Sequence, residues 1–222
     1  MDKDSIDIEG ELIAHRMGID GIDLTDEKEE STEKTGAGKS ADNGKIDLYD
    51  FIQCVITAVV IGIMIFVFAF RVIGVDGRSM YSTLHHGDKV IVSGLFYTPK
   101  QGDIIILKTE MYEKPLVKRI IATENQTVDI DFQSGIVYVD GQALDEPYTY
   151  EPTYIDEGFV GPVTVPEGCV FVMGDNRNGS NDSRCSKIGF IDERSIFGKV
   201  YFLLFPGVDQ GGPDWSRIGS VY

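Results

Sequence analysis

Three separate stretches of the chain contain residue types that can hydrolyse a peptide bond. Ser79 lies in the loop-like sequence 77–84, which reads Gly-Arg-Ser-Met-Tyr-Ser-Thr-Leu. Lys118 lies in the apolar segment 116–121, and residues 174–184 alternate Asp, Asn, Arg and Ser. A serine hydroxyl is a poor nucleophile until a base takes its proton. If Ser79 is a nucleophile, the chain must therefore supply a base.

Lys118 is one candidate base. In a strand its side chain points to the same face as Leu116 and Ile120, and burial there would lower its pKa. A depression of about 3 units, at a cost of roughly 4 kcal/mol, would leave a usable neutral fraction at neutral pH. Taken alone, however, the stretch fits better a surface lysine beside Arg119 on a sheet edge.

Histidine is the other candidate base. His85 and His86 follow Ser79 closely, whereas His15 lies far away near the N-terminus. The adjacent Gly87-Asp88 pair is typical of a turn, where consecutive histidines are usually solvated. A base at one of these two histidines therefore stays as the alternative.

Together and in this order, the three stretches resemble the motifs of type I signal peptidases, over about Asp47–Pro206. The first reads S-M-Y-S-T-L against S-M-x-P-T-L, with Ser82 in place of proline. The second reads K-R-I-I-A against K-R-V-I-G, with Ala122 in place of glycine. The third matches eight of the eleven positions of G-D-N-R-x-x-S-x-D-S-R. These are membrane-anchored proteases with a Ser/Lys pair.

The resemblance implies a role for each matched residue. Ser79 would be the nucleophile and Lys118 the general base, with Ser180 orienting the lysine amine. The backbone N–H of Ser79 would form part of the oxyanion hole. Some relatives supply a second, hydroxyl donor two residues earlier, where this chain has Gly77. Four supporting residues complete the set: an ion pair of Asp182 with Arg184, and Asp175 and Arg177, which would steady the loop.

The resemblance also implies how substrate binds. The segments Val75–Ser79 and Leu116–Lys118 would take it up as an added β-strand. Met80 and Leu84 would help to wall shallow pockets for small side chains, and the substrates would be exported preproteins with A-x-A-like cleavage sites. The residues expected at this binding site are Val75, Gly77, Met80, Leu84, Leu116 and Val117. No metal or cofactor is indicated. A polar turn or a calcium-type loop is the alternative for residues 174–184, and the arginines there disfavour a metal.

A transmembrane helix is predicted over Phe51–Phe70, which holds no charge between Asp50 and Arg71. At about 1.5 Å per residue it spans roughly 30 Å, the thickness of a hydrocarbon core. A buried helix and a cleaved signal sequence are the alternatives. Counting basic residues on either side does not decide the direction. The resemblance implies a cytoplasmic tail, with the catalytic domain on the outer face of the cell membrane.

Residues 1–46 are predicted to form a disordered, acidic tail. Fifteen of the 36 acidic residues lie in the first fifty positions, and the segment is too polar to bury a core. Gly36–Ser40 suggests a phosphate-binding loop, but the first glycine of that motif is replaced by Glu33 and no strand precedes it.

Residues 71–222 are predicted to form an all-β catalytic domain, built as curled antiparallel sheets or a small barrel. Asp140-Gly141 predicts a hairpin turn, and no amphipathic helix is evident. The predicted strands are Lys89–Val92, Ile104–Leu107, Leu116–Ala122, Thr127–Asp131, Ile136–Val139, Gly168–Met173 and Gly198–Phe205.

Composition narrows the range of partners. The net charge of −16 shows no basic face, which excludes nucleic acid as a partner. Of the three cysteines, Cys54 lies in the apolar run, and the sequence leaves open whether Cys169 and Cys185 pair.

The preferred interpretation is a membrane-bound serine endopeptidase that removes signal peptides from preproteins. Three alternatives stay open at this point. They are a Ser/Lys protease for one dedicated substrate, a membrane-tethered β-domain that binds peptides without cutting them, and a structural surface protein.

Overall fold

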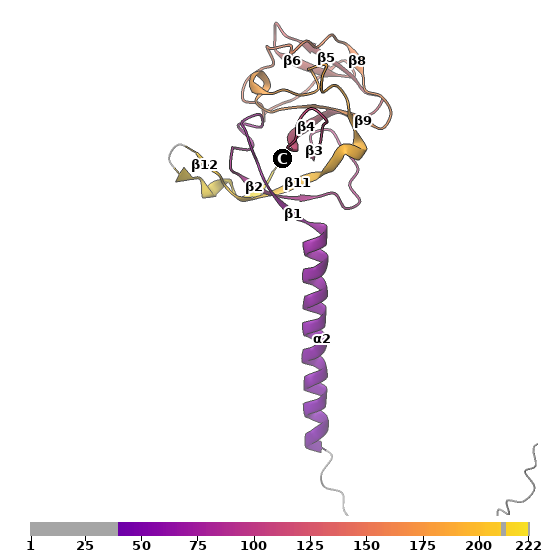
Figure 1. Cartoon of the computed structure of the whole chain (residues 1–222), viewed down its shortest axis with the longest axis vertical. Coiled ribbons are helices and arrows are strands. Elements are labelled where there is room, and N and C mark those ends of the chain that lie inside the picture. Colours follow the sequence, from indigo (N-terminus) through magenta and orange to yellow (C-terminus); the bar gives the residue numbers. More distant parts are fainter. Residues whose placement is uncertain (1–39, 210–211, 222) are drawn as a thin grey trace, which may run out of the picture. The chain divides into compact units, whose positions relative to one another are not determined.

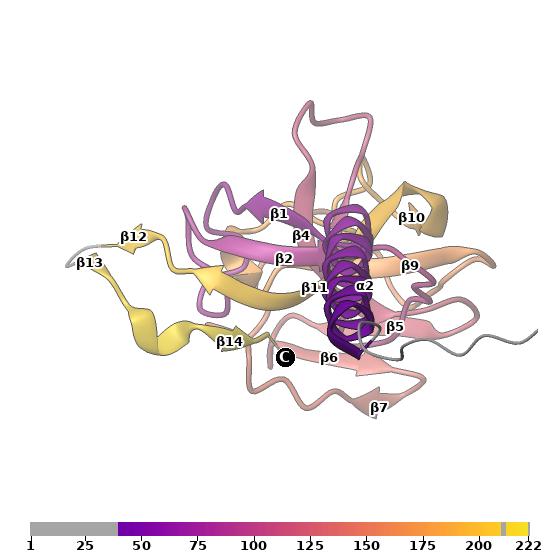
Figure 2. The same ribbon diagram turned by 90° about the horizontal axis from the view of Figure 1, so that it is seen from below.

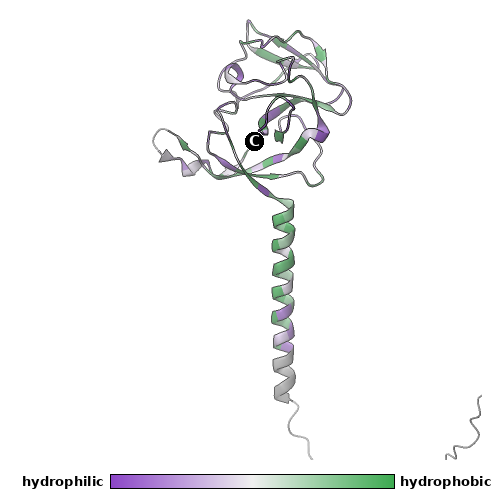
Figure 3. Cartoon of the chain, in the orientation of Figure 1, coloured by the Kyte–Doolittle hydropathy of each residue, from purple (hydrophilic) through white to green (hydrophobic). Residues whose placement is uncertain are grey.

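The structure is a computed structural model that describes residues 40–209 and 212–221. Helix α2 spans Ser40–Ala69, so it begins before the predicted span and ends one residue short of it. Its segment Asp47–Ala69, whose most apolar 18-residue window has a mean hydropathy of 2.7, is long and apolar enough to cross a membrane (Figure 3). The rest of the predicted tail, residues 1–39, lies outside the described residues.

The rest of the described chain is β-structure joined by loops and short 3-10 turns, so the all-β prediction is confirmed. Four predicted strands, β3 to β6, have the predicted bounds. The 3-10 turns are η2 (Arg177–Gly179), η3 (Glu193–Ser195) and η4 (Trp215–Arg217). The strands are β1 (Arg71–Gly74), β2 (Lys89–Ser93), β3 (Ile104–Leu107), β4 (Leu116–Ala122), β5 (Thr127–Asp131), β6 (Ile136–Val139), β7 (Gln142–Ala143), β8 (Val163–Thr164), β9 (Cys169–Met173), β10 (Ile191–Asp192), β11 (Ile196–Phe205), β12 (Val208–Asp209), β13 (Gly212–Pro213) and β14 (Gly219–Ser220).

The large sheet has the order β1-β2-β11-β3-β4-β9-β10, and β14 pairs with β11. Strands β1, β2 and β11 lie side by side in Figure 2. Every neighbouring pair from β1 to β4 is antiparallel, so β1 and β4 run in the same direction. Register shifts along β11 bend the sheet. The curl brings the chain after β1 to the chain before β4, where Lys114 Nζ lies 2.6 Å from Asp76 Oδ2.

The second sheet has the order β7-β6-β5-β8 and gathers at one end of the domain (Figure 1). Its β6–β7 hairpin turns at Asp140 and Gly141, with φ of 52° and 77°. Positive φ at both central residues is the geometry of a type I′ turn, which Asp-Gly favours. The predicted hairpin is therefore confirmed.

The apolar core anchors the loop that carries Ser79. Met80 and Leu84 are 1% and 0% exposed and pack in one cluster with Val90, Ile104 and other strand residues. Two further clusters fill the space beside β4 and β9. Because the side chains of Met80 and Leu84 fix the loop to the core, the position of Ser79 depends on core packing.

Candidate active site

Lys118 lies near the middle of β4 and is 2% exposed. Burial lowers the pKa of its amine to about 8; the charge of Arg184 also lowers it, while the carboxylates of Asp182 and Asp175 raise it. A lysine with such a pKa is roughly one-tenth neutral at pH 7. The surface-lysine alternative is wrong, because both Lys118 and the adjacent Arg119 are buried.

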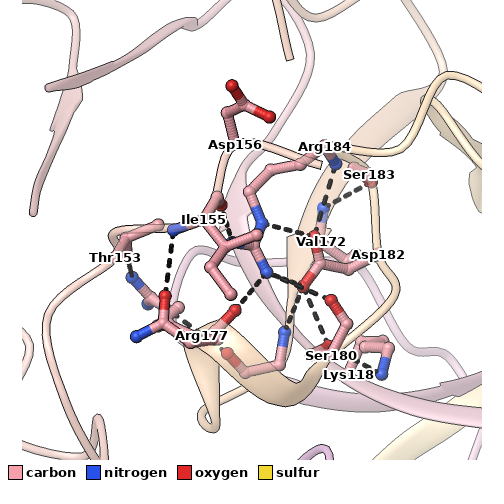
Figure 4. A network of polar contacts seen from close by, with 12 residues as sticks. Lys118, Thr153, Ile155, Asp156, Val172, Arg177, Ser180, Asp182, Ser183 and Arg184 are labelled. Carbon is pink, nitrogen blue, oxygen red and sulfur yellow. Dashed lines mark hydrogen bonds and ion pairs between the residues drawn. The ribbon is translucent and has the colours of Figure 1, made fainter. Parts of the chain in front are cut away.

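Ser180 connects Lys118 to a buried carboxylate. The Lys118 amine donates to Ser180 Oγ at 3.1 Å, and Ser180 Oγ donates to Asp182 Oδ2 at 2.9 Å (Figure 4). A hydroxyl has one proton to donate. Because the Ser180 hydroxyl donates its hydrogen bond to Asp182, it can only accept one from the Lys118 amine. The lone pair of the amine nitrogen is therefore not used in this contact.

Asp182 is itself held from two sides. Arg184 Nε lies 2.8 Å from its Oδ1, which is the predicted ion pair, and the N–H of Gly174 donates to Oδ2 at 3.0 Å. Arg184 also donates to the carbonyls of Arg177 and Ser180. A buried ion pair needs such further hydrogen bonds to offset its desolvation. The network is therefore rigid and fully paired around Ser180.

Asp175 and Arg177 extend this network to parts of the chain that the motifs did not indicate. Asp175 accepts two hydrogen bonds from Arg119, at 2.8 and 2.7 Å, and a third from the Thr83 hydroxyl. Arg177 forms an ion pair with Glu146. The resemblance placed Arg119 beside Lys118 but gave it no role, and no sequence pattern marks Glu146.

The Thr83–Asp175 contact links the Ser79 loop to the third stretch, and the backbone completes that link. Ser79 O accepts the N–H of Asn176 at 3.0 Å, and Asn176 Nδ2 donates to Arg78 O at 3.2 Å. A Cβ on Gly174 would lie within 3.0 Å of both Ser79 O and Ser180 Oγ. Ser79 therefore lies against the same backbone that carries the partner of Lys118.

The hydroxyl of Ser79 makes no hydrogen bond to Lys118 or to any other described residue. The residue itself is half-buried. Contacts between nucleophile and base are often long in substrate-free sites and shorten when substrate binds. The arrangement thus brings Ser79, Ser180 and Lys118 into one neighbourhood.

The expected substrate-binding residues differ in exposure. Leu116 and Val117 are half-buried, and β9 pairs with β4 only from Arg119 onward, so the 116–118 edge faces no strand on that side. Met80 and Leu84 are 1% and 0% exposed and pack in the core beneath the loop. Their part in walling pockets for small side chains stays a prediction.

The segment Val75–Ser79 is irregular and not a regular strand. Both backbone groups of Val75 are bonded to the chain before β2, since its N–H donates to Asp88 O and its C=O accepts from Gly87 N–H. The N–H of Gly77 donates to His86 Nδ1 at 3.1 Å. Asp76, between them, has no backbone hydrogen bond within the described residues, so its backbone groups are available to a peptide.

The histidines and cysteines have other environments. The His85 ring stacks on Tyr81 at 4.9 Å, and His86 Nδ1 lies 3.4 Å from Asp76 Oδ1. Cys169 and Cys185 are free thiols, so they are not paired. Within the described residues, no group of three or more His, Cys, Asp or Glu could hold a metal ion.

Known proteins match this chain over most of its length. The family model of signal peptidase, peptidase S26, matches residues 48–205. Probable signal peptidase I-1 of Synechocystis sp. is 36% identical over 180 residues, which cover 76% of this chain and 86% of that protein. Signal peptidase I T of Bacillus subtilis is 35% identical over 193 residues, covering 82% and 96%. A crystal structure of a signal peptidase I from Enterococcus faecalis V583 is 30% identical and covers 46% of this chain and 97% of that chain, with a TM-score of 0.39.

The matched region contains all three motif stretches, from Ser79 to Arg184. Family membership therefore favours an enzyme over the peptide-binding and structural alternatives. The chain belongs to the signal peptidase family, peptidase S26, and is a serine protease.

Proposed function

We propose that this protein cleaves signal peptides from exported preproteins, with Ser79 as nucleophile and Lys118 as general base. The observation that carries the proposal is the buried Lys118 amine, whose pKa is lowered to about 8 and which donates to Ser180. A general base works best when its pKa lies near the operating pH.

In the first half of the reaction, neutral Lys118 takes the proton of the Ser79 hydroxyl while Oγ attacks the scissile carbonyl. Ser180 fixes the amine by accepting one of its N–H bonds, which turns the lone pair toward Ser79. The resulting oxyanion accepts the backbone N–H of Ser79, which has no partner among the described residues. The ammonium then protonates the leaving amine, and the acyl group stays on Ser79.

In the second half, Lys118 is neutral again and deprotonates a water that attacks the acyl-enzyme. The ammonium returns the proton to Ser79 Oγ as the ester bond breaks. One group thus serves both halves, first as base and then as acid. The charges of Asp182 and Arg184 stay paired throughout, so the network orients the amine.

Substrate binds as an extended strand between the two rims of the site. One rim is the backbone of Asp76 and Gly77, and the other is the open edge of Leu116–Lys118. Because β1 and β4 run in the same direction, a peptide running alongside them points its cleavage site toward Ser79 and Lys118. Val75, Met80 and Leu84 form the buried support of the first rim. Small residues fit such a shallow floor.

The cleavage site lies close to a bilayer. From Phe70 to Ser79 even an extended chain reaches at most about 30 Å. Helix α2 anchors the protein in the cell membrane with the β-domain on the outer face, where exported precursors present the residues that follow their apolar segment. Residues 1–46 form the cytoplasmic tail.

The test is cleavage of a secretory precursor by the full-length protein in detergent, beside Ser79→Ala and Lys118→Ala. Cleavage after small residues, lost in both variants with unchanged thermal midpoints, is the expected result. Sequencing the new N-terminus of the product identifies the bond that is cut. Cleavage by folded Ser79→Ala would disprove Ser79 as nucleophile. A dedicated Ser/Lys protease would cut one precursor and leave unrelated secretory precursors intact.

A further inference from the structure

A further buried carboxylate lies at the far end of the loop that carries Ser79. Asp88, just before β2, is 0% exposed and accepts four hydrogen bonds. The N–H groups of Gly207 and His85 donate at 2.7 and 2.8 Å. Arg217 donates through Nη1 at 3.1 Å and Nη2 at 2.7 Å. Such a fork fixes both oxygens of the carboxylate.

These donors join two segments that are distant in sequence. We call residues 76–88 the nucleophile loop and residues 206–221 the C-terminal segment. Arg217 also donates to the carbonyl of Thr83 at 3.2 Å, so it bonds the nucleophile loop at two places. Thr83 is the residue whose hydroxyl binds Asp175. The loop is thus held from the third motif on one side and from the C-terminal segment on the other.

The C-terminal segment also packs tightly against the backbone of the nucleophile loop. A Cβ on Gly207 would overlap the backbone of His86, Gly87 and Asp88, so the two chains touch directly there. Further on, Val221 packs on the cluster that contains Met80 and Leu84. The C-terminal segment therefore covers the nucleophile loop with backbone, an ion pair and an apolar contact.

We propose that Arg217 is a positioning residue, which holds the nucleophile loop through Asp88 and Thr83 so that Ser79 stays in reach of Lys118. This inference rests on the proposed function of Ser79 and adds the C-terminal segment to the catalytic apparatus. Arg217 does not touch the reacting atoms; it acts through the loop.

The electrostatics agree with this geometry. Burial alone would raise the pKa of Asp88, but the bonds from Arg217 and the two N–H groups outweigh burial and hold that pKa below its ordinary value. Removing Arg217 leaves a buried carboxylate without its cation and frees the Thr83 carbonyl. Misplacement of a reacting group by about 1 Å can cost roughly a hundredfold in rate.

The experiment measures kcat and KM of full-length Arg217→Ala on a secretory precursor, with and without millimolar guanidinium chloride. Arg217 lines a surface cavity of about 400 Å³ with Tyr81, His85 and Asp214, so a free guanidinium ion can enter. We expect kcat to fall roughly ten- to a hundredfold with little change in KM, and guanidinium to restore part of it. General destabilisation would not respond to the added ion.

Arg194→Ala is the matched control, because Arg194 forms a similar fork with Asp192 on the surface, away from the loop. It should leave kcat unchanged and show no response to guanidinium. A folded Arg217→Ala with parental kcat, or with a loss that guanidinium does not repair, would overturn the proposal. If Arg217→Ala does not fold, Arg217→Lys decides: reduced kcat at a normal thermal midpoint supports the role, and parental kcat refutes it. Ser79→Ala, run in parallel, separates a failure of this inference from a failure of the proposed function.

Discussion

Two charged clusters lie beside the start of β4, an inner one around Lys118 and an outer one formed by Lys114 and Asp76, and they differ in burial. In the inner cluster, Lys118 is 2% exposed and donates to Ser180, which in turn donates to Asp182. In the outer cluster, the side chains of Lys114 and Asp76 are 80% and 57% exposed, although their contact of 2.6 Å is shorter than the 3.1 Å hydrogen bond from Lys118 to Ser180.

The distance between two charged atoms therefore does not measure how much the pair contributes to stability or catalysis. In water an ion pair gains little, because solvent screens it and two flexible side chains must be ordered. In the interior, desolvation shifts a pKa and thereby makes a base. The inner cluster is therefore expected to govern chemistry and the outer cluster only access. The following predictions test this contrast.

The largest effect is expected for Lys118→Arg. A guanidinium cannot serve as a neutral base at physiological pH, so cleavage should fall by about 10²- to 10⁴-fold. The parent activity should rise with pH through about 8, since deprotonation creates the base. The measurement is kcat/KM against pH for both proteins, with circular dichroism to verify the fold. Substantial activity in the arginine variant would end the lysine mechanism.

Gly174→Ala should have the next largest effect on activity. Its new Cβ would press on Ser79 O and Ser180 Oγ together and move nucleophile and base apart. We expect a loss of roughly a hundredfold in kcat. Gly219→Ala is the control, because its Cβ meets no atom within 4 Å. Equal kcat values for the two alanine variants would show that catalysis tolerates a displacement of Ser79 relative to Ser180.

The third prediction concerns stability. Burial disfavours the Lys118 ammonium, with a pKa of about 8 in the fold against a reference value of 10.5. Below pH 8 the fold therefore bears the full penalty, about 3 kcal/mol, which disappears as pH rises through 10.5. Lys118→Met should be more stable than the parent at pH 7, by up to this amount, and equally stable near pH 10.5.

Urea unfolding at both pH values measures that difference, with the exposed Lys187→Met as control. Lys187→Met should follow the parent at both pH values, because its side chain is solvated in either state. If Lys118→Met is no more stable than the parent at pH 7, burial does not destabilise the Lys118 ammonium. The proposed difference in desolvation between the inner and outer clusters would then be contradicted.

The same contrast explains what the sequence could and could not predict. Strands β3 to β6 have continuous or alternating apolar residues, and their bounds were predicted correctly. Strands of two residues, such as β8 and β10, are too short for any periodicity and were missed. The three motifs indicated Ser79, Lys118 and Ser180 as candidate site residues.

The burial of Lys118 could not be predicted from its neighbours in the sequence, because its hydrogen-bond partner Ser180 lies more than sixty positions away. Likewise Arg217 and Asp88 are 129 positions apart, and neither stands in a pattern that indicates the other. Met80 directly follows Ser79, but no periodicity in the loop sequence indicates that its side chain packs in the core.

A smaller effect is expected when His85 and His86 are both changed to Ala. His86 accepts a hydrogen bond from the N–H of Gly77 and His85 stacks on Tyr81, so some loop order is lost, but in the proposed mechanism neither ring supplies the base. Turnover should stay within about threefold of the parent, the loss of exposed contacts being slight. A fall of several orders of magnitude in a folded variant would revive the histidine alternative.

The smallest effect is expected for Lys114→Ala, in the outer cluster. Lys114 bridges to Asp76 across the rims between which the peptide must enter, so a strong pair there would oppose binding. Because both side chains are solvated, the pair opens easily, and its removal should leave kcat unchanged and change KM by no more than about twofold. Kinetics at low and high salt check this, since screening should make parent and variant alike. A large change in kcat would mean that exposed and buried charges contribute alike, which the difference in their solvation argues against.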